Sequence, residues 1–177
     1  MKTKNIISSL VLTFLFLHVS SAQTPVDRNG YLAFFNEKIP VGAAALAKDK
    51  TVLPLSPPEN DPILLSIKNY ILKTGDIELI KLLLQYQVAY PNPENDHIAR
   101  ALGEIFFNQT PAFEEAYEQL IPNYRLLVFP YIKFGWGKAI EGKNTSLPSV
   151  LEKQKRFDKI AQSLINLRGY QDQPTVE

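Results

Sequence analysis

The chain has 177 residues, a formal net charge of +1, no cysteine and two histidines. Without cysteine it forms no disulfide and offers neither a thiol nucleophile nor a Cys/His zinc site, and we expect no metal or other cofactor. The near-neutral charge argues against broad electrostatic binding to nucleic acid or to an anionic membrane surface.

Residues 1–22 have the pattern of a cleavable secretory signal peptide. Lys2 and Lys4 give a positive start, residues 6–19 are mostly apolar, and the small residues Ser-Ser-Ala occupy positions 20–22. An uncleaved membrane anchor is the alternative, but the apolar run is shorter than the roughly 20 residues that cross a bilayer. We therefore expect an exported protein of a bacterial cell envelope, periplasmic or extracellular, with no stable membrane span after cleavage.

Residues 23–60 predict an irregular N-terminal segment. A short helix is expected over residues 30–38 and should stop at Pro40, and the alanine-rich residues 41–50 predict one or two further helical turns. Residues 51–60 contain Pro54, Pro57 and Pro58, which indicates a linker or an ordered surface loop.

Residues 61–169 predict the helical core of a single domain. Three pairs of a capping residue followed by proline mark helix starts. The pairs are Asp61-Pro62, Asn92-Pro93 and Thr110-Pro111. Helices are expected over residues 62–74, 76–90, 93–108, 111–121 and 147–168, with Gly75 and Gly169 at helix ends and a flexible tail over 170–177. Residues 124–141 should form a kinked or split helix, because they contain Pro130, Gly135 and Gly137.

Short loops between these helices predict two successive antiparallel hairpins, over residues 62–89 and 93–121. The two hairpins share a pattern of apolar residues. In the first unit it consists of Leu64, Ile67, Ile71, Gly75-Asp76 at the turn, Ile80, Leu84, and Pro91 or Pro93 after it. In the second unit it consists of Ile98, Ala101, Leu102, Ile105, Ala116 and Leu120. In these residues the chain resembles tetratricopeptide-type repeats. That resemblance implies a scaffold that binds other proteins along a concave face. The predicted fold class is all-α, as an irregular antiparallel helical bundle, which we favour, or as a short α-hairpin repeat array.

The one histidine after the leader, His97, lies among charged residues of a predicted helix. It is the natural general base beside Asp96. Spacings of four residues, however, make Asp96, Arg100 and Glu104 an ordinary ladder of surface salt bridges. We favour the ladder.

Three further carboxylates, Glu114, Glu115 and Glu118, form the densest acidic cluster. Glycoside cleavage by carboxylates needs two such groups facing each other across a cleft. These three share one helix, which favours a solvated helical face.

The aromatic segment 129–137 is the candidate contact surface. Its binding candidates are Phe129, Tyr131, Phe134 and Trp136, because Trp and Tyr recur at binding hot spots and glycines flank Trp136. The competing interpretation places these rings in the core. An exposed apolar patch around Tyr131 and Trp136 would favour binding. The residue inventory favours a non-enzymatic binding or accessory protein that recognises a protein or peptide, and the alternative is a small carboxylate-dependent hydrolase acting on a glycan.

Overall fold

The computed structural model describes residues 27–49 and 51–171, with side chains through residue 165. Within these ranges the chain is all-α and has no strand, which confirms the predicted fold class. The elements are α1 (Arg28–Lys48), the 3-10 turn η1 (Pro58–Asn60), α2 (Asp61–Thr74), α3 (Ile77–Ala89), α4 (Asp96–Asn108), α5 (Thr110–Glu118), α6 (Pro122–Ile140) and α7 (Pro148–Gln171). The predicted signal peptide lies outside the described residues. None of the described helices is both long and apolar enough to cross a membrane.

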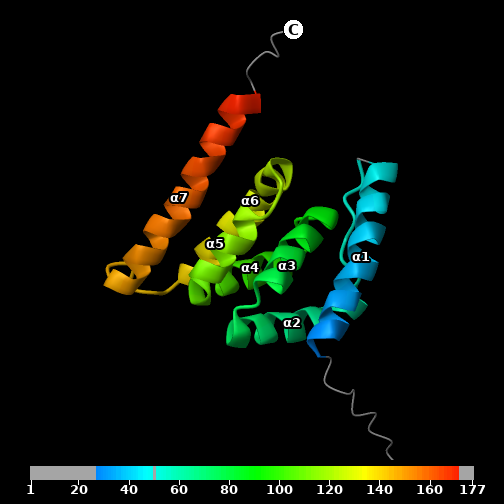
Figure 1. The fold of residues 1–177 in the computed structure, drawn as a ribbon, viewed down its shortest axis with the longest axis horizontal. Coiled ribbons are helices and arrows are strands. Elements are labelled where there is room, and N and C mark those ends of the chain that lie inside the picture. The colour runs from blue at the N-terminus through cyan, green and yellow to red at the C-terminus, as the bar shows by residue number, and fades with distance from the viewer. Residues whose placement is uncertain (1–26, 50, 172–177) are drawn as a thin grey trace, which may run out of the picture.

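The helices form two layers of alternate elements. In one layer α1 packs on α3, α3 on α5, and α5 on α7, and these helices follow one another from right to left in Figure 1. In the other layer α2 packs on α4, and α4 on α6. Helices α1 and α3 run parallel, because Arg28 at the start of α1 bonds Asp76 at the start of α3, and Lys38 farther along α1 is bonded by Tyr90 at the end of α3. The core lies between the layers.

Helix α1 continues through Pro40, so the prediction that Pro40 ends the helix is wrong. Proline removes one backbone donor, but Pro40 is exposed and an alanine-rich stretch of high helix propensity follows it. Packing on Tyr90, the residue after α3, holds both halves of the helix. The Tyr90 hydroxyl donates to the Lys38 carbonyl at 3.1 Å, and its ring lies so close to Gly42 that a Cβ there would come within 2.6 Å of it.

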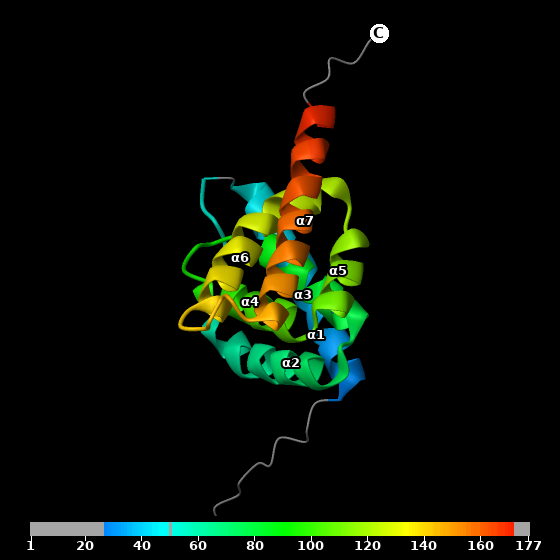
Figure 2. The same ribbon diagram turned by 90° about the vertical axis from the view of Figure 1, so that its left-hand side faces the viewer.

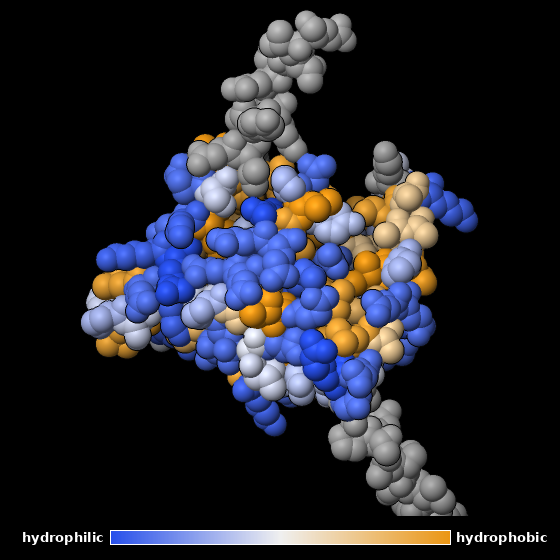
Figure 3. All heavy atoms as spheres, in the orientation of Figure 1, coloured by the Kyte–Doolittle hydropathy of each residue, from blue (hydrophilic) through white to orange (hydrophobic). Residues whose placement is uncertain are grey.

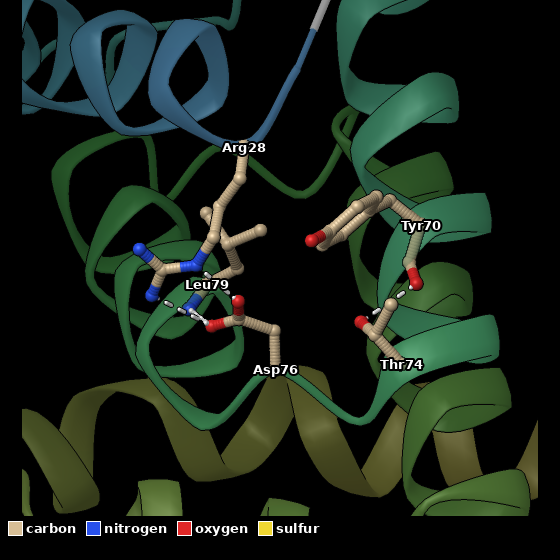
Figure 4. Close-up of polar contacts among 5 residues, drawn as sticks. All are labelled: Arg28, Tyr70, Thr74, Asp76 and Leu79. Atoms are coloured by element: carbon tan, nitrogen blue, oxygen red, sulfur yellow. Dashed lines mark hydrogen bonds and ion pairs between the residues drawn. The ribbon is translucent and has the colours of Figure 1, made fainter.

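The turn between α2 and α3 shows the expected capping chemistry (Figure 4). Gly75 ends α2 in the left-handed region at φ 63°. Asp76 caps α3 by accepting a hydrogen bond from the Leu79 N–H, and the Arg28 guanidinium of α1 bonds the same carboxylate with a 2.5 Å Nε–Oδ2 distance. One carboxylate therefore joins the starts of α1 and α3.

Helix α4 begins three residues later than predicted, at Asp96. The Asn92 side chain closes a turn by accepting from the Glu94 N–H, and so it does not cap the helix. The buried Asn95 occupies the N-cap position, but its side chain bonds the backbone of the loops that precede α4. It accepts from the Ser56 N–H and donates to the Tyr90 carbonyl.

Helix α5 is shorter than predicted and ends at Glu118. The Thr110 hydroxyl donates to the Phe106 carbonyl one turn back and does not cap α5. Arg125 from the next helix donates to the carbonyls of Leu120 and Glu118, which supplies partners to the end of α5.

Helix α6 is continuous through Pro130, so the expected split does not occur. Pro130 faces solvent, while Gly135 packs against Gly103 of α4 at backbone distance. Among the described helices, α4 and α6 also share the most extensive contact.

The proline-rich segment before α2 packs on the helices. Ser56 and Asn60 are buried, and both bond the hydroxyl of the fully buried Tyr86, at 2.7 and 3.0 Å. The neighbouring outer residues are apolar and exposed, and Figure 3 shows hydrophobic residues gathered on the side of the molecule where α1 lies. The exposed large apolar residues here are Val41 of α1 and Val52, Leu53 and Leu55 of the segment before α2.

Helix α7 is the outermost element. It lies across α5 and α6 and extends beyond the body of the molecule toward its C-terminal end (Figure 2). It begins at Pro148 and runs to Gln171, so the predicted exit at Gly169 is wrong. Its inward face carries Val150, Phe157, Ile160 and Leu164.

Candidate functional site

A groove with a volume of about 330 Å³ lies between α2 and α4. This volume falls within the range of small-ligand and peptide side-chain pockets. Its floor is apolar and its rim is charged. We use 'floor' for the apolar lining residues, Leu64, Leu65, Leu83, Ile98 and Ala101, and 'rim' for the polar ones, Asp61, Lys68, His97, Arg100 and Glu104.

Two polar pairs join the walls of the groove. His97 Nε2 lies 3.2 Å from Asp61 Oδ1, and Lys68 Nζ lies 2.9 Å from Glu104 Oε2. Each pair joins one residue of α2 to one of α4. The two α2 residues are seven positions apart, as are the two α4 residues, so the helices lie side by side in parallel for about two turns. The pairs bound the groove at its two ends.

The structure confirms one half of the predicted ladder on α4. Arg100 Nε bonds Asp96 Oδ2 at 2.9 Å. Glu104, predicted to continue the ladder, bonds Lys68 of α2 instead. The partner of His97 is Asp61, which the spacing within one helix did not indicate. Aligning the starts of the two predicted hairpins, which lie 31 residues apart, would have paired Asp61 with Asn92 and not with His97.

The His97–Asp61 pair places an imidazole beside a carboxylate. A carboxylate can orient an imidazole that acts as a general base. None of the residues that line the groove, however, carries a hydroxyl or thiol for that base to activate. The arrangement is suited to holding an apolar group between charged ends.

The aromatic segment reaches this region through one residue, Phe134. Its side chain is 43% exposed, and the guanidinium carbon of Arg100 lies 5.7 Å from the centre of its ring. This distance is typical of a cation–π contact. Phe134 therefore extends the surface of the groove from α4 onto α6.

The other three aromatic candidates turn toward the interior. Trp136 is only 4% exposed, stacks on Phe157 of α7 with ring centres 5.5 Å apart, and donates from Nε1 to Gln154 at 3.0 Å. Phe129 is half-buried and also stacks on Phe157. The Tyr131 hydroxyl donates to the Pro91 carbonyl. Trp136 is thus a core residue, and a role of any of the four in binding stays a prediction.

The acidic residues of α5 do not face one another across a cleft. Glu114 pairs with Arg156 of α7 at 2.7 Å, and Glu115 and Glu118 are exposed. The hollow between Glu114, Glu118 and α7 has a volume of about 110 Å³, too small for a sugar ring and its neighbours. Across the described part of the chain, no three His, Cys, Asp or Glu side chains are placed to hold a metal ion.

Comparison with known proteins adds no functional information. The chain matches no protein-family model, no curated protein and no solved structure.

Proposed function

We propose that the protein is an exported, non-enzymatic binding protein of the bacterial cell envelope that holds a peptide segment of another protein in the groove between α2 and α4. The observation that carries the proposal is the apolar floor bounded at each end by a polar pair between the helices. Such a floor takes up an apolar side chain, while the charged ends contact the polar groups that flank it.

The solvent exposure of the apolar residue Leu65 is the most direct support for a binding partner. It lies in the groove, yet its side chain is 55% exposed. A peptide that covered Leu65 would remove this apolar surface from water, which favours binding by about 25 cal/mol per Å². The partial exposure of Asp61, Glu104 and His97 leaves their side chains accessible to the same partner.

The alternative, a carboxylate-dependent glycan hydrolase, has no comparable support. That chemistry needs two carboxyl groups separated by the scissile bond, one of them protonated. Glu114 is engaged by the Arg156 guanidinium, and Glu115 is exposed. No contact of the described residues favours this function over binding.

The test is selection of ligands from a random displayed-peptide library on the immobilised full chain. The affinity of each selected peptide is then measured by fluorescence anisotropy against the unaltered protein, Leu65→Ala and Leu127→Ala. Leu127 is a matched control, because it is equally exposed at 57% but lies on α6 outside the groove. We expect Leu65→Ala to weaken binding about tenfold or more, in proportion to the apolar surface lost, and Leu127→Ala to leave it unchanged.

Selected peptides that bind Leu65→Ala as tightly as the unaltered protein would contradict the proposal. So would a failure to select any peptide. Helix content by circular dichroism verifies that both variants are folded, which is expected because both leucines are exposed.

A further inference from the structure

We infer that the groove selects peptides in which a carboxylate accompanies the inserted apolar side chain, and that Arg100 binds this carboxylate. The inference rests on the proposed function of the same groove. It concerns which class of peptide enters, and it follows from how the charges of the rim are paired.

Each carboxylate that lines the groove already lies beside a nitrogen of the opposite wall. His97 Nε2 lies 3.2 Å from Asp61 Oδ1, and Lys68 Nζ donates to Glu104. Arg100 differs, because its carboxylate partner, Asp96, is not among the lining residues. Arg100 is therefore the one charged residue of the rim whose partner stands outside the groove.

The bond to Asp96 uses only one edge of the Arg100 side chain. Asp96 accepts from Nε, whereas a guanidinium carries five N–H donors in a planar fork. Among the described residues, no hydrogen bond engages the terminal nitrogens of Arg100. Two parallel bonds from such a fork to a carboxylate are a frequent and strong arrangement.

Phe134 helps to orient this fork. The guanidinium carbon lies 5.7 Å from the centre of the Phe134 ring, and Asp96 holds the same side chain at Nε. Two contacts restrict the long side chain before a ligand arrives, which lowers the entropy lost on binding. Arg100 also lies one turn from Glu104 and close to Ala101 of the floor, so its carboxylate ligand would sit beside the apolar side chain and not at a distant position.

Lys68 adds a second cation on the facing wall. Its side chain is 19% exposed, whereas that of its partner Glu104 is 45% exposed. Most of the Lys68 side chain is therefore covered, and its ammonium lies at the Glu104 carboxylate. An acidic peptide meets one cation on each wall, Lys68 on α2 and Arg100 on α4, and of these two only Arg100 has a carboxylate partner that does not line the groove.

The experiment compares acidic peptides with their amide forms. Each peptide selected on the full chain is synthesised a second time with every Glu replaced by Gln and every Asp by Asn. Affinities are measured for the unaltered protein, Arg100→Gln, Arg100→Lys and Lys138→Gln. Lys138 is a matched control, because it pairs with Glu141 at the surface of α6 and its replacement removes the same charge outside the groove.

We expect the acidic form to bind the unaltered protein about tenfold more tightly than the amide form, the effect of a hydrogen bond to a charged group. Lys138→Gln should keep this preference, Arg100→Gln should lose it, and Arg100→Lys should keep part of it, because lysine retains the charge without the fork.

Two results would overturn the inference and leave the proposed function intact. In the first, peptides whose binding depends on Leu65 bind equally well in acidic and amide forms. In the second, the acidic preference persists in Arg100→Gln. Absence of any peptide whose binding depends on Leu65 would instead overturn the proposed function, and the inference with it.

Discussion

Gly103 of α4 and Gly135 of α6 lie backbone to backbone. A Cβ at Gly103 would lie 2.0 Å from the Gly135 carbonyl carbon, and a Cβ at Gly135 would lie 1.8 Å from the Ala99 carbonyl oxygen. No side chain fits at either position unless the helices separate. The spacing between α4 and α6, and with it the placement of Phe134 beside Arg100, depends on these two glycines.

Gly135→Ala should therefore lower the free energy of unfolding by at least about 3 kcal/mol, the upper part of the range for overpacking, because the atoms it meets are backbone. Gly137→Ala is the control on the same helix. Gly137 is exposed, and a Cβ there meets no atom within 4 Å, so this variant should gain about 0.5–1 kcal/mol from the better helix propensity of alanine. Urea denaturation measures both. Equal effects of the two substitutions would contradict the close approach of α4 and α6.

Truncation of two neighbouring aromatic residues of α6 should change stability by very different amounts. Trp136→Ala removes a buried ring and its bond to Gln154, and we expect a loss of about 3–5 kcal/mol in the free energy of unfolding. Phe134→Ala removes a half-exposed ring and should change stability by less than about 1 kcal/mol. Thermal unfolding followed by circular dichroism compares the two. A Trp136→Ala protein as stable as the unaltered one would show that Trp136 is not part of the core.

Asp76 should stabilise the fold in a pH-dependent way. Burial alone would raise the pKa of Asp76, but the bond and charge of Arg28 and the bond from the Leu79 N–H outweigh burial and hold that pKa below its usual value. A carboxyl group whose pKa is lower in the folded state contributes stability above its unfolded pKa. This contribution is lost as the pH falls through the lower, folded value.

Two substitutions separate the roles of Asp76. Asp76→Ala removes both the cap and the ion pair, and should cost about 1 kcal/mol for the cap alone. Asp76→Asn keeps a good capping residue and removes the charge, so it should cost less. The difference between the unaltered protein and Asp76→Asn should be present at pH 7 and shrink below about pH 4. Urea titrations over this range measure it, and a difference that grew toward acid pH would contradict the assigned ion pair.

Buried tyrosines should make the fold sensitive to alkali. Burial raises the pKa of Tyr86 and of Tyr117 above the ordinary value of a phenol. A tyrosine whose pKa is higher in the folded state than in the unfolded state stabilises the fold. This contribution is fully present below about pH 10, and it is lost as the pH rises through the pKa of the folded state. Absorbance at 295 nm, recorded with circular dichroism, should show that these phenols ionise only as the helices unfold.

Tyr117→Phe supplies the control for this alkaline transition. It removes one of the late-ionising groups, so stability should fall less steeply above pH 10. Complete phenol ionisation near pH 10 with native helix content would contradict the burial of these rings.

The sequence predicted most helices but misjudged prolines and caps. Pro40 was predicted to end a helix and Pro130 to kink or split one, but both lie inside continuous helices, where each is exposed. Asp61, Asn92 and Thr110 were predicted to be caps. Asp61 instead lies inside α2, after Asn60 at the N-cap position, and the side chains of Asn92 and Thr110 bond other backbone groups. Local propensity describes a single helix, whereas the competing contacts come from the rest of the fold.

The groove was harder to predict than the helices. Arg100 with Asp96 follows from spacing along one helix, and the structure confirms it. The pairing of His97 with Asp61 depends on which helices lie side by side, a relation between two hairpins that no local pattern contains. Phe134 is exposed whereas Trp136, two residues later, is buried. This difference likewise depends on which side of α6 faces α4 and α7.

The alternation of helices between two layers also bears on how the chain folds. Helix α3 packs on α1, α4 on α2, and α6 on α4, and in each pair the partner is synthesised shortly before. The main contacts therefore form between segments that are close in the sequence. Loop closure of this kind costs little entropy, and topologies rich in local contacts reach the native state quickly. Helix α7 joins last, on α5 and α6, and we expect its amides to exchange with solvent hydrogen before those of α3 and α4.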